Sequence, residues 1–174
     1  MIINEDIRNY LLTLNNGELI PYPTDTVWGI GCDATNPEAI NKVFALKQRR
    51  QAKKMICLVS DLKMMEKYVH QVPETTHKII ELSTKPTTII YDQLHNLTQN
   101  LVAEDDALTI HEASNEFCQK LIRQFRHPIV YTSTNIGNNP SLQSFSEISH
   151  QILMDVGYVV NLHRDKKAQP RAVS

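Results

Sequence analysis

Five cations lie within the eight residues from Lys47 to Lys54, in the stretch KQRRQAKK. Cations packed this closely repel one another unless an anion or carboxylates compensate them. On charge alone, an anion site and a solvated helix end explain the segment equally well, because cations also favour the negative end of the helix dipole. Its position favours the anion site, since loops that lead into buried strands commonly carry ligands in α/β folds.

A second candidate is the hydroxyl-rich loop from Pro21 to Thr26. Its two prolines fix the backbone, so that the hydroxyls of Thr24 and Thr26 and the carboxylate of Asp25 are held in place. Such a loop suits a small polar ligand. The alternative is an ordered strand connection whose hydroxyls bond to their own backbone, and the loop taken alone favours this simpler interpretation.

The third candidate is the uncharged loop from Tyr131 to Ser141, which includes the end of the most hydrophobic predicted strand. Its hydroxyls and amides offer donors to phosphate or ribose oxygens. An ordinary turn-rich loop remains the alternative. The segment does not match the P-loop pattern, and no Gly-x-Gly-x-x-Gly element opens a helix.

Other chemistry has less support. The seven histidines show no metal-ligand spacing, so the sequence predicts no metal-ligating residues. The run Glu104-Asp105-Asp106 predicts a solvated turn, with magnesium left open. No serine lies in a nucleophile elbow, which leaves covalent hydrolase chemistry without support.

The elements that must position these segments alternate along the chain. Asn36 and Pro37 form a strong helix start, for example, because asparagine caps a helix and proline fits its first turn. Strands and helices interleave without a strict repeat, which predicts a single α/β domain over residues 1–174, with a twisted, open, mixed sheet flanked by helices. Helices are predicted at 4–16, 36–47, 61–68, 73–82, 115–125 and 145–154, and strands at 18–22, 27–32, 56–60, 87–91, 107–110, 129–132 and 158–162.

Composition is that of an ordinary globular domain. The chain has 174 residues, of which 41% are hydrophobic and 21% charged, and its net charge of −1 gives no global basic field for nucleic acid. No apolar run approaches the roughly 20 residues that span a bilayer, and the amino terminus lacks a secretory signal, so we expect a cytoplasmic protein without a membrane anchor. The three cysteines are an odd number in apolar contexts and are expected to be buried free thiols.

Taken in order, the three segments resemble the YrdC-like family of L-threonylcarbamoyladenylate synthases, and the resemblance covers nearly the whole chain. The stretch PTDTVWGIGCD (23–33) is similar to the family's opening signature. ATNPEAINKVFALKQRR (34–50) continues it, with Lys47 and Arg49 on the family's Lys-x-Arg pair. TSTNIGNNPS (132–141) is similar to its Ser-Ala-Asn loop. Three ordered motifs make this resemblance specific.

The resemblance implies a short, single-domain YrdC-like fold and a nucleotidyltransferase. Its reaction converts L-threonine, bicarbonate and ATP into threonylcarbamoyl-AMP and pyrophosphate, the former being the donor for N6-threonylcarbamoyladenosine in tRNA. ATP is then a substrate, with Mg²⁺ expected beside it. Candidate partners are tRNA or double-stranded RNA, and the proteins that transfer the threonylcarbamoyl group downstream.

The resemblance also implies roles for individual residues. Lys47 and Arg49 are the catalytic candidates, because transfer at phosphorus depends on positioning and charge stabilisation. The nucleotide-binding candidates are Lys47, Arg49, Lys53, Thr88, Ser133, Asn135 and Ser141. The candidates for substrate threonine are Thr24, Thr26 and His111.

Two positions depart from the family pattern. His111 stands where the family usually has an arginine, and Arg171 lies where it tends to have a pair of hydroxyl residues. These departures motivate an alternative, a catalytically impaired YrdC-like module that binds RNA, although the near-neutral net charge argues against it. A carbamoyl-transfer relative acting on another acceptor also remains open.

Overall fold

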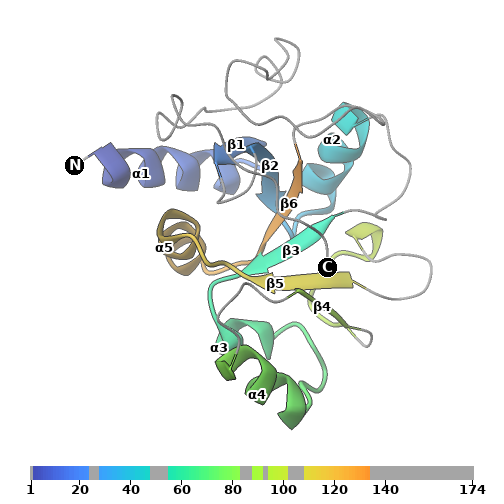
Figure 1. Ribbon diagram of the computed structural model, residues 1–174. Helices are drawn as coiled ribbons and strands as arrows, with labels where there is room; N and C mark the ends of the chain where they lie inside the picture. The colour runs from blue at the N-terminus through green and yellow to red at the C-terminus, as the bar shows by residue number, and fades with distance from the viewer. Residues whose placement is uncertain are drawn as a thin grey trace.

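The computed structural model describes residues 2–23, 28–47, 55–82, 88–91, 94–101 and 108–133 (Figure 1). Every helix and strand expected before residue 134 is present, with boundaries within two residues of those predicted for most of them. The expected elements at 145–154 and 158–162 lie outside the described residues. The elements are α1 (Ile2–Asn15), β1 (Ile20–Pro23), β2 (Trp28–Asp33), α2 (Pro37–Lys47), β3 (Ile56–Val59), α3 (Leu62–Met65), α4 (Glu74–Leu82), β4 (Thr88–Tyr91), the 3-10 helix η1 (Gln99–Leu101), β5 (Leu108–Glu112), α5 (Glu116–Phe125) and β6 (Ile129–Ser133).

The six described strands form one mixed sheet in the order β1-β2-β6-β3-β5-β4. Strands β3 and β5 are parallel, and the other neighbouring pairs are antiparallel. In Figure 1, α1 and α5 lie to the left of the sheet and α2 and η1 to the right. The mixed sheet flanked by helices therefore confirms the fold class expected from the sequence.

Local capping explains where several helices begin and end. The Asn36 side chain accepts hydrogen bonds from the backbone of Glu38 at 3.0 Å and of Ala39 at 3.2 Å, which fixes the start of α2. Asn115 caps α5 in the same way through the backbone N–H groups of Phe117 and Cys118. The cap recognised in the sequence at Asn36 thus marks the same boundary in the structure.

The helices on the left are joined to the sheet by aromatic contacts. The Tyr10 ring of α1 packs edge-on against Phe117 of α5, with ring centroids 5.7 Å apart. The Tyr10 hydroxyl donates a hydrogen bond to the carbonyl of Pro21 in β1. A single side chain therefore links α1, α5 and the strand that leads into the hydroxyl-rich loop.

One face of the sheet is closed by the core. Successive residues of a strand point to opposite faces, and paired residues on neighbouring strands share a face. On the closed face the apolar side chains of β2, β3, β5 and β6 are at most 3% exposed, and two of the three free cysteines lie there. These residues are Trp28, Ile30, Cys32, Cys57, Val59, Leu108, Ile110 and Val130, whereas Glu112 at the end of β5 and Ile89 on β4 share this face and are partly exposed.

The other face, which we call the open face, is less completely covered. Ile56 pairs with Tyr131 on one side and with Thr109 on the other, and all three are partly exposed. Next to Thr109, Ile90 of β4 is 69% exposed. Three neighbouring strands are thus partly exposed on this face, and we expect a ligand that contacts the sheet to contact it here.

A close contact on the open face explains why position 29 is glycine. Tyr131 pairs with Gly31 in register, but its ring lies over Gly29, where a Cβ atom would overlap the ring carbons Cδ2 and Cε2. The contact leaves no room for any side chain at position 29. Gly29 and Tyr131 are therefore one packing unit, although residues 29 and 131 are far apart in the sequence.

We expect Gly29→Ala to destabilise the fold by roughly 1–3 kcal/mol, because the added methyl group overpacks against the ring. In a Tyr131→Ala background the same change should cost less than about 0.5 kcal/mol or stabilise, because alanine restricts the unfolded chain more than glycine does. Urea denaturation of the four proteins measures the coupling. Equal costs of Gly29→Ala in both backgrounds would contradict the contact.

Asp61 fixes the chain where it leaves β3. Its side chain accepts a hydrogen bond from the backbone N–H of Met64 at 2.9 Å and another from the Ser60 hydroxyl at 2.9 Å, and thereby caps α3. Burial acts to raise the pKa of Asp61. The two hydrogen bonds and the nearby charges of Arg123 and Lys63 outweigh it and hold the pKa below its ordinary value.

We expect Asp61→Asn to flatten the acid limb of the stability curve. The depressed pKa of Asp61 in the folded state means that its ionised form stabilises the protein above the ordinary aspartate pKa, and that this contribution is lost as pH falls below about 4. Asparagine also caps helices, so the variant should lose little at pH 7. Urea denaturation at a series of pH values from 7 down to the acid range gives the unfolding free energy of both proteins. If both proteins lost the same free energy below pH 4, the stabilising role assigned to ionised Asp61 would be refuted.

Candidate functional site

The three candidate loops begin at one edge of the sheet. Strand β1 ends at Pro23, which pairs with Trp28 at the start of β2. Strand β6 ends at Ser133, which pairs with Gly29, one residue into β2. Strand β3 begins at Ile56, which pairs with Tyr131. We call this side of the sheet the loop edge.

Each candidate loop is therefore tied to its neighbours by strand pairing. The hydroxyl-rich loop connects β1 with β2, the basic segment connects α2 with β3, and the uncharged loop continues from β6. Strands β2 and β3 both pair with β6, which runs between them in the opposite direction. The backbone thus brings together the starting points of three segments that the sequence singled out separately.

Lys47 is the one candidate cation within the described residues. It is the last residue of α2, and only 1% of its surface is exposed. An ammonium group that is removed from water needs compensating polar or charged partners. Burial is inconsistent with a solvated helix end, so for Lys47 the structure removes that alternative.

His111 and Thr88 lie together on the open face, farther from the loop edge. His111 of β5 is partly exposed and pairs with Leu58 of β3 and with Thr88 of β4. It follows Thr109 by two residues, which places it about 7 Å farther along the strand. Position 133 falls on the same face, because Ser133 and Tyr131 are two residues apart in β6. The open face therefore connects the loop edge with His111.

The remaining candidates lie outside the described residues. The positions concerned are Thr24, Asp25, Thr26, Arg49, Lys53, Asn135, Ser141 and Arg171, together with the acidic run at 104–106. For Thr88 and Ser133 the structure describes the backbone but not the side chain.

Sequence reasoning missed Tyr131 as a site residue. It named Tyr131 only as the start of the uncharged loop, whereas the structure places the ring on the open face beside the loop edge. The signal was present in the strand alternation, because Tyr131 and Ser133 must share a face. What the sequence did not reveal was the glycine on another strand that makes room for the ring.

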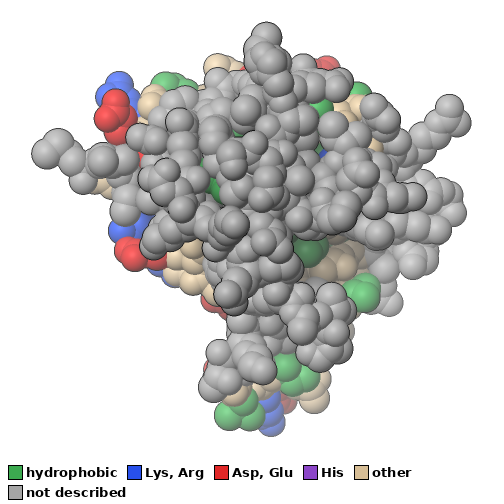
Figure 2. Space-filling model, turned by 45° about the horizontal axis from the view of Figure 1, so that its top comes forward, with side chains coloured by type: hydrophobic (Ala, Val, Ile, Leu, Met, Phe, Trp, Pro, Cys, Tyr) green, Lys and Arg blue, Asp and Glu red, His purple; other side chains and the backbone are tan. Residues whose placement is uncertain are grey.

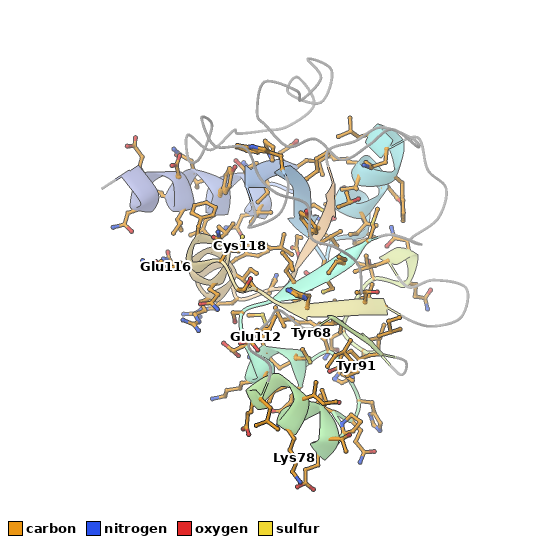
Figure 3. All side chains as sticks on the ribbon, viewed as in Figure 1. Tyr68, Lys78, Tyr91, Glu112, Glu116 and Cys118 are labelled. Carbon is orange, nitrogen blue, oxygen red and sulfur yellow. The ribbon has the colours of Figure 1, made fainter. Side chains whose placement is uncertain are left out.

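Carboxylates gather at the opposite edge of the sheet. Strands β2, β3 and β5 run in the same direction, and their far ends carry Asp33, Asp61 and Glu112. Figure 3 shows Glu112 at the end of β5 near α3. Burial raises the pKa of Glu112, the charge of Asp61 raises it further, and Arg123 opposes them. These three acidic groups are therefore separated from the loop edge by the length of the strands.

The far-edge groups have structural roles. Asp33 accepts hydrogen bonds from the backbone N–H of Thr35 at 2.8 Å and from its hydroxyl at 2.7 Å, which fixes the turn after β2. His127 approaches the same carboxylate, with Nδ1 3.6 Å from Oδ2. This arrangement ties the end of β2 to the start of β6 and preserves the register between them.

The closed face carries no reactive thiol. Burial raises the pKa of Cys57 to about 12, and it raises the pKa of Cys32 even further, with a contribution from Asp33. Both thiols are therefore protonated at neutral pH and act as small apolar side chains. The free cysteines expected from the sequence are confirmed as buried.

Metal and membrane sites are absent from the part of the chain that the structure describes. No group of three or more histidine, cysteine or acidic residues there could hold a metal ion. None of the helices in the same ranges combines the length and apolar character that crossing a membrane requires.

Comparison with known proteins gives consistent matches. A family model for Sua5_yciO_yrdC, described as telomere recombination, matches residues 13–173. A threonylcarbamoyl-AMP synthase of Photobacterium profundum is 28% identical over 151 residues, covering 85% of this chain and 82% of the relative. One from Pseudoalteromonas translucida is 28% identical over 163 residues, covering 92% and 87%.

The same fold occurs in a solved structure. P. abyssi Sua5 complexed with L-threonine superposes with a TM-score of 0.81 at 21% identity, over 95% of this chain. This chain spans 47% of that longer protein, about half its length. At this identity the superposition establishes the fold.

Proposed function

Because this chain belongs to the Sua5/YciO/YrdC family, we propose that it is an L-threonylcarbamoyladenylate synthase. It joins L-threonine, bicarbonate and ATP to form threonylcarbamoyl-AMP and pyrophosphate. The observation that supports the proposal is that the strand ends bordering three separately recognised segments lie at one edge of the sheet. Relatives named threonylcarbamoyl-AMP synthase support it over most of both chains.

The loop edge suits the triphosphate of ATP. Lys47 is buried at the end of α2, and the basic segment that contains Arg49 and Lys53 leads from it to β3, which begins at this edge. The carboxylates Asp33, Asp61 and Glu112 lie at the far edge, so they do not repel an anion at the loop edge strongly. In this proposal Lys47 and Arg49 stabilise the charge that develops when the bond between the α- and β-phosphates breaks.

The remaining candidate residues are assigned to binding either the nucleotide or the amino acid. Ser133, Asn135 and Ser141 contribute donors for the nucleotide on the β6 side, with Thr88 farther along the open face. Thr24 and Thr26 hold threonine at the hairpin turn. His111 lies on β5, with β6 and β3 between it and β2, so in this proposal it does not contact a threonine held at the hairpin turn.

Magnesium enters this proposal with the substrate. Protein sites for Mg²⁺ commonly use one or two carboxylates together with substrate phosphates and water. Bound to the triphosphate, the ion would neutralise phosphate charge.

The enzyme interpretation is better supported than an RNA-binding module. Four cations of the described surface are paired with carboxylates, namely Lys42 with Glu18, Lys78 with Glu74, Lys120 with Glu116 and Arg123 with Asp61. Figure 2 likewise shows blue and red side chains next to each other at its left margin. Paired charges give a weak field for nucleic acid. We place tRNA downstream, as the acceptor of the product in the cytoplasm, reached through separate transfer proteins.

The activity has a direct test. Purified protein incubated with ATP, bicarbonate and threonine should release pyrophosphate, and omission of any one substrate should abolish the release. Enzyme-coupled detection of pyrophosphate measures the rate, and mass spectrometry identifies threonylcarbamoyl-AMP. Release that does not depend on threonine, or no release at high enzyme concentration, would refute the proposal.

We expect Lys47→Met to lower kcat/KM for ATP by roughly tenfold to a hundredfold, the equivalent of one charge-assisted phosphate hydrogen bond. The matched control is Lys42→Met on the same helix, which removes a half-exposed cation paired with Glu18. That variant should keep its kcat/KM within about twofold, since exposed pairs contribute little. If both variants lost activity equally while remaining folded, Lys47 would have no specific role.

A further inference from the structure

Tyr131 is an aromatic residue whose ring the structure places on the open face beside the loop edge. Its ring lies over Gly29, and the side chain is partly exposed rather than enclosed in the core. On the closed face, by contrast, the neighbouring residues Val130 and Ile30 are completely buried. The ring therefore covers part of the sheet surface that faces the proposed ligand.

The direction of the side chain identifies which part of the site it covers. The backbone of Tyr131 lies opposite Gly31, whereas its ring carbons lie over Gly29, two residues nearer the start of β2. The side chain thus leans away from β3 and toward the β1–β2 hairpin. Strands β1 and β2 converge there at the paired residues Pro23 and Trp28, from which the hydroxyl-rich loop begins.

The chemistry of the ring suits a short, partly polar side chain. A tyrosine ring offers apolar carbon to a methyl group and, at its end, a hydroxyl that exchanges hydrogen bonds. Gly29 lets the ring lie low on the sheet, but the ring still occupies space that a deeper pocket would need. A group resting on it must therefore be small.

We propose that the Tyr131 ring is the floor of the amino-acid subsite and limits the amino-acid substrate to the size of threonine. This inference rests on the proposed function, because it assigns a specificity-determining residue to that reaction. A single methylene group is worth roughly 10- to 200-fold in discrimination at an apolar surface. The ring should accordingly reject a homologue that is one carbon longer.

The test compares threonine with β-hydroxynorvaline, which keeps the β-hydroxyl and adds one methylene group. For the unmodified protein we expect kcat/KM to favour threonine. Tyr131→Ala should lower the ratio of the two kcat/KM values by roughly tenfold or more, with the KM for ATP unchanged. Tyr131→Phe retains the ring and should keep the ratio.

Ile90→Ala is the matched control, since Ile90 lies on the open face but on β4, away from the hairpin, and is 69% exposed. It should leave the ratio unchanged. An unchanged ratio in Tyr131→Ala, or an effect confined to the KM for ATP, would overturn the inference. If Tyr131→Ala shows no cooperative unfolding, Tyr131→Leu replaces it and is judged by the same ratio.

Calorimetric titration of the protein with each amino acid separates this inference from the proposed function. Tighter binding of threonine than of β-hydroxynorvaline, lost in Tyr131→Ala, would support the subsite even if no pyrophosphate were released. Pyrophosphate release with the same ratio of amino acids in both proteins would support the reaction and reject the role of Tyr131. Failure to bind either amino acid would reject the subsite.

Discussion

Strand β6 lies between β2 and β3 and pairs with both, and the arrangement of the site depends on this pairing. The strands concerned are distant in the sequence, so their pairing requires closing long loops, and only the closed core on one side of the sheet compensates for that entropy. A shift of one residue would move Tyr131 to the closed face. The overlap of the Tyr131 ring with the space above Gly29 opposes such a shift.

The same register separates charges across the sheet. Because β2, β3 and β5 run in one direction, the carboxylates at their ends collect at the far edge, where they stabilise turns and caps. The basic segment starts from the buried Lys47 and leads to β3, which begins at the other edge. Over this distance the described carboxylates Asp33, Asp61 and Glu112 interact only weakly with charges at the loop edge in a hydrated protein.

The two faces of the sheet divide structure from function. The closed face is filled by apolar residues and thiols whose raised pKa values keep them neutral, so its contribution is stability. The open face carries glycine, tyrosine, threonine and histidine, which pack less completely and can contact a ligand.

Local signals in the sequence were sufficient for the elements. Asn36 and Asn115 cap helices that the sequence predicted, and apolar runs became the strands of a mixed sheet, because capping and alternation are properties of neighbouring residues. The short helix η1 was not predicted, since three residues carry too little pattern. The sequence also identified Lys47 and the three loops, but it could not distinguish a solvated cation from a buried one.

Tertiary structure decided the rest. Burial of Lys47, the shared edge of the three loops and the ring of Tyr131 over Gly29 all depend on contacts between residues far apart in the chain. Such contacts follow from strand order and register, which the packing of the whole core selects. The sequence by itself therefore determined which residues could do the chemistry, and only the folded sheet determined which of them face the same ligand.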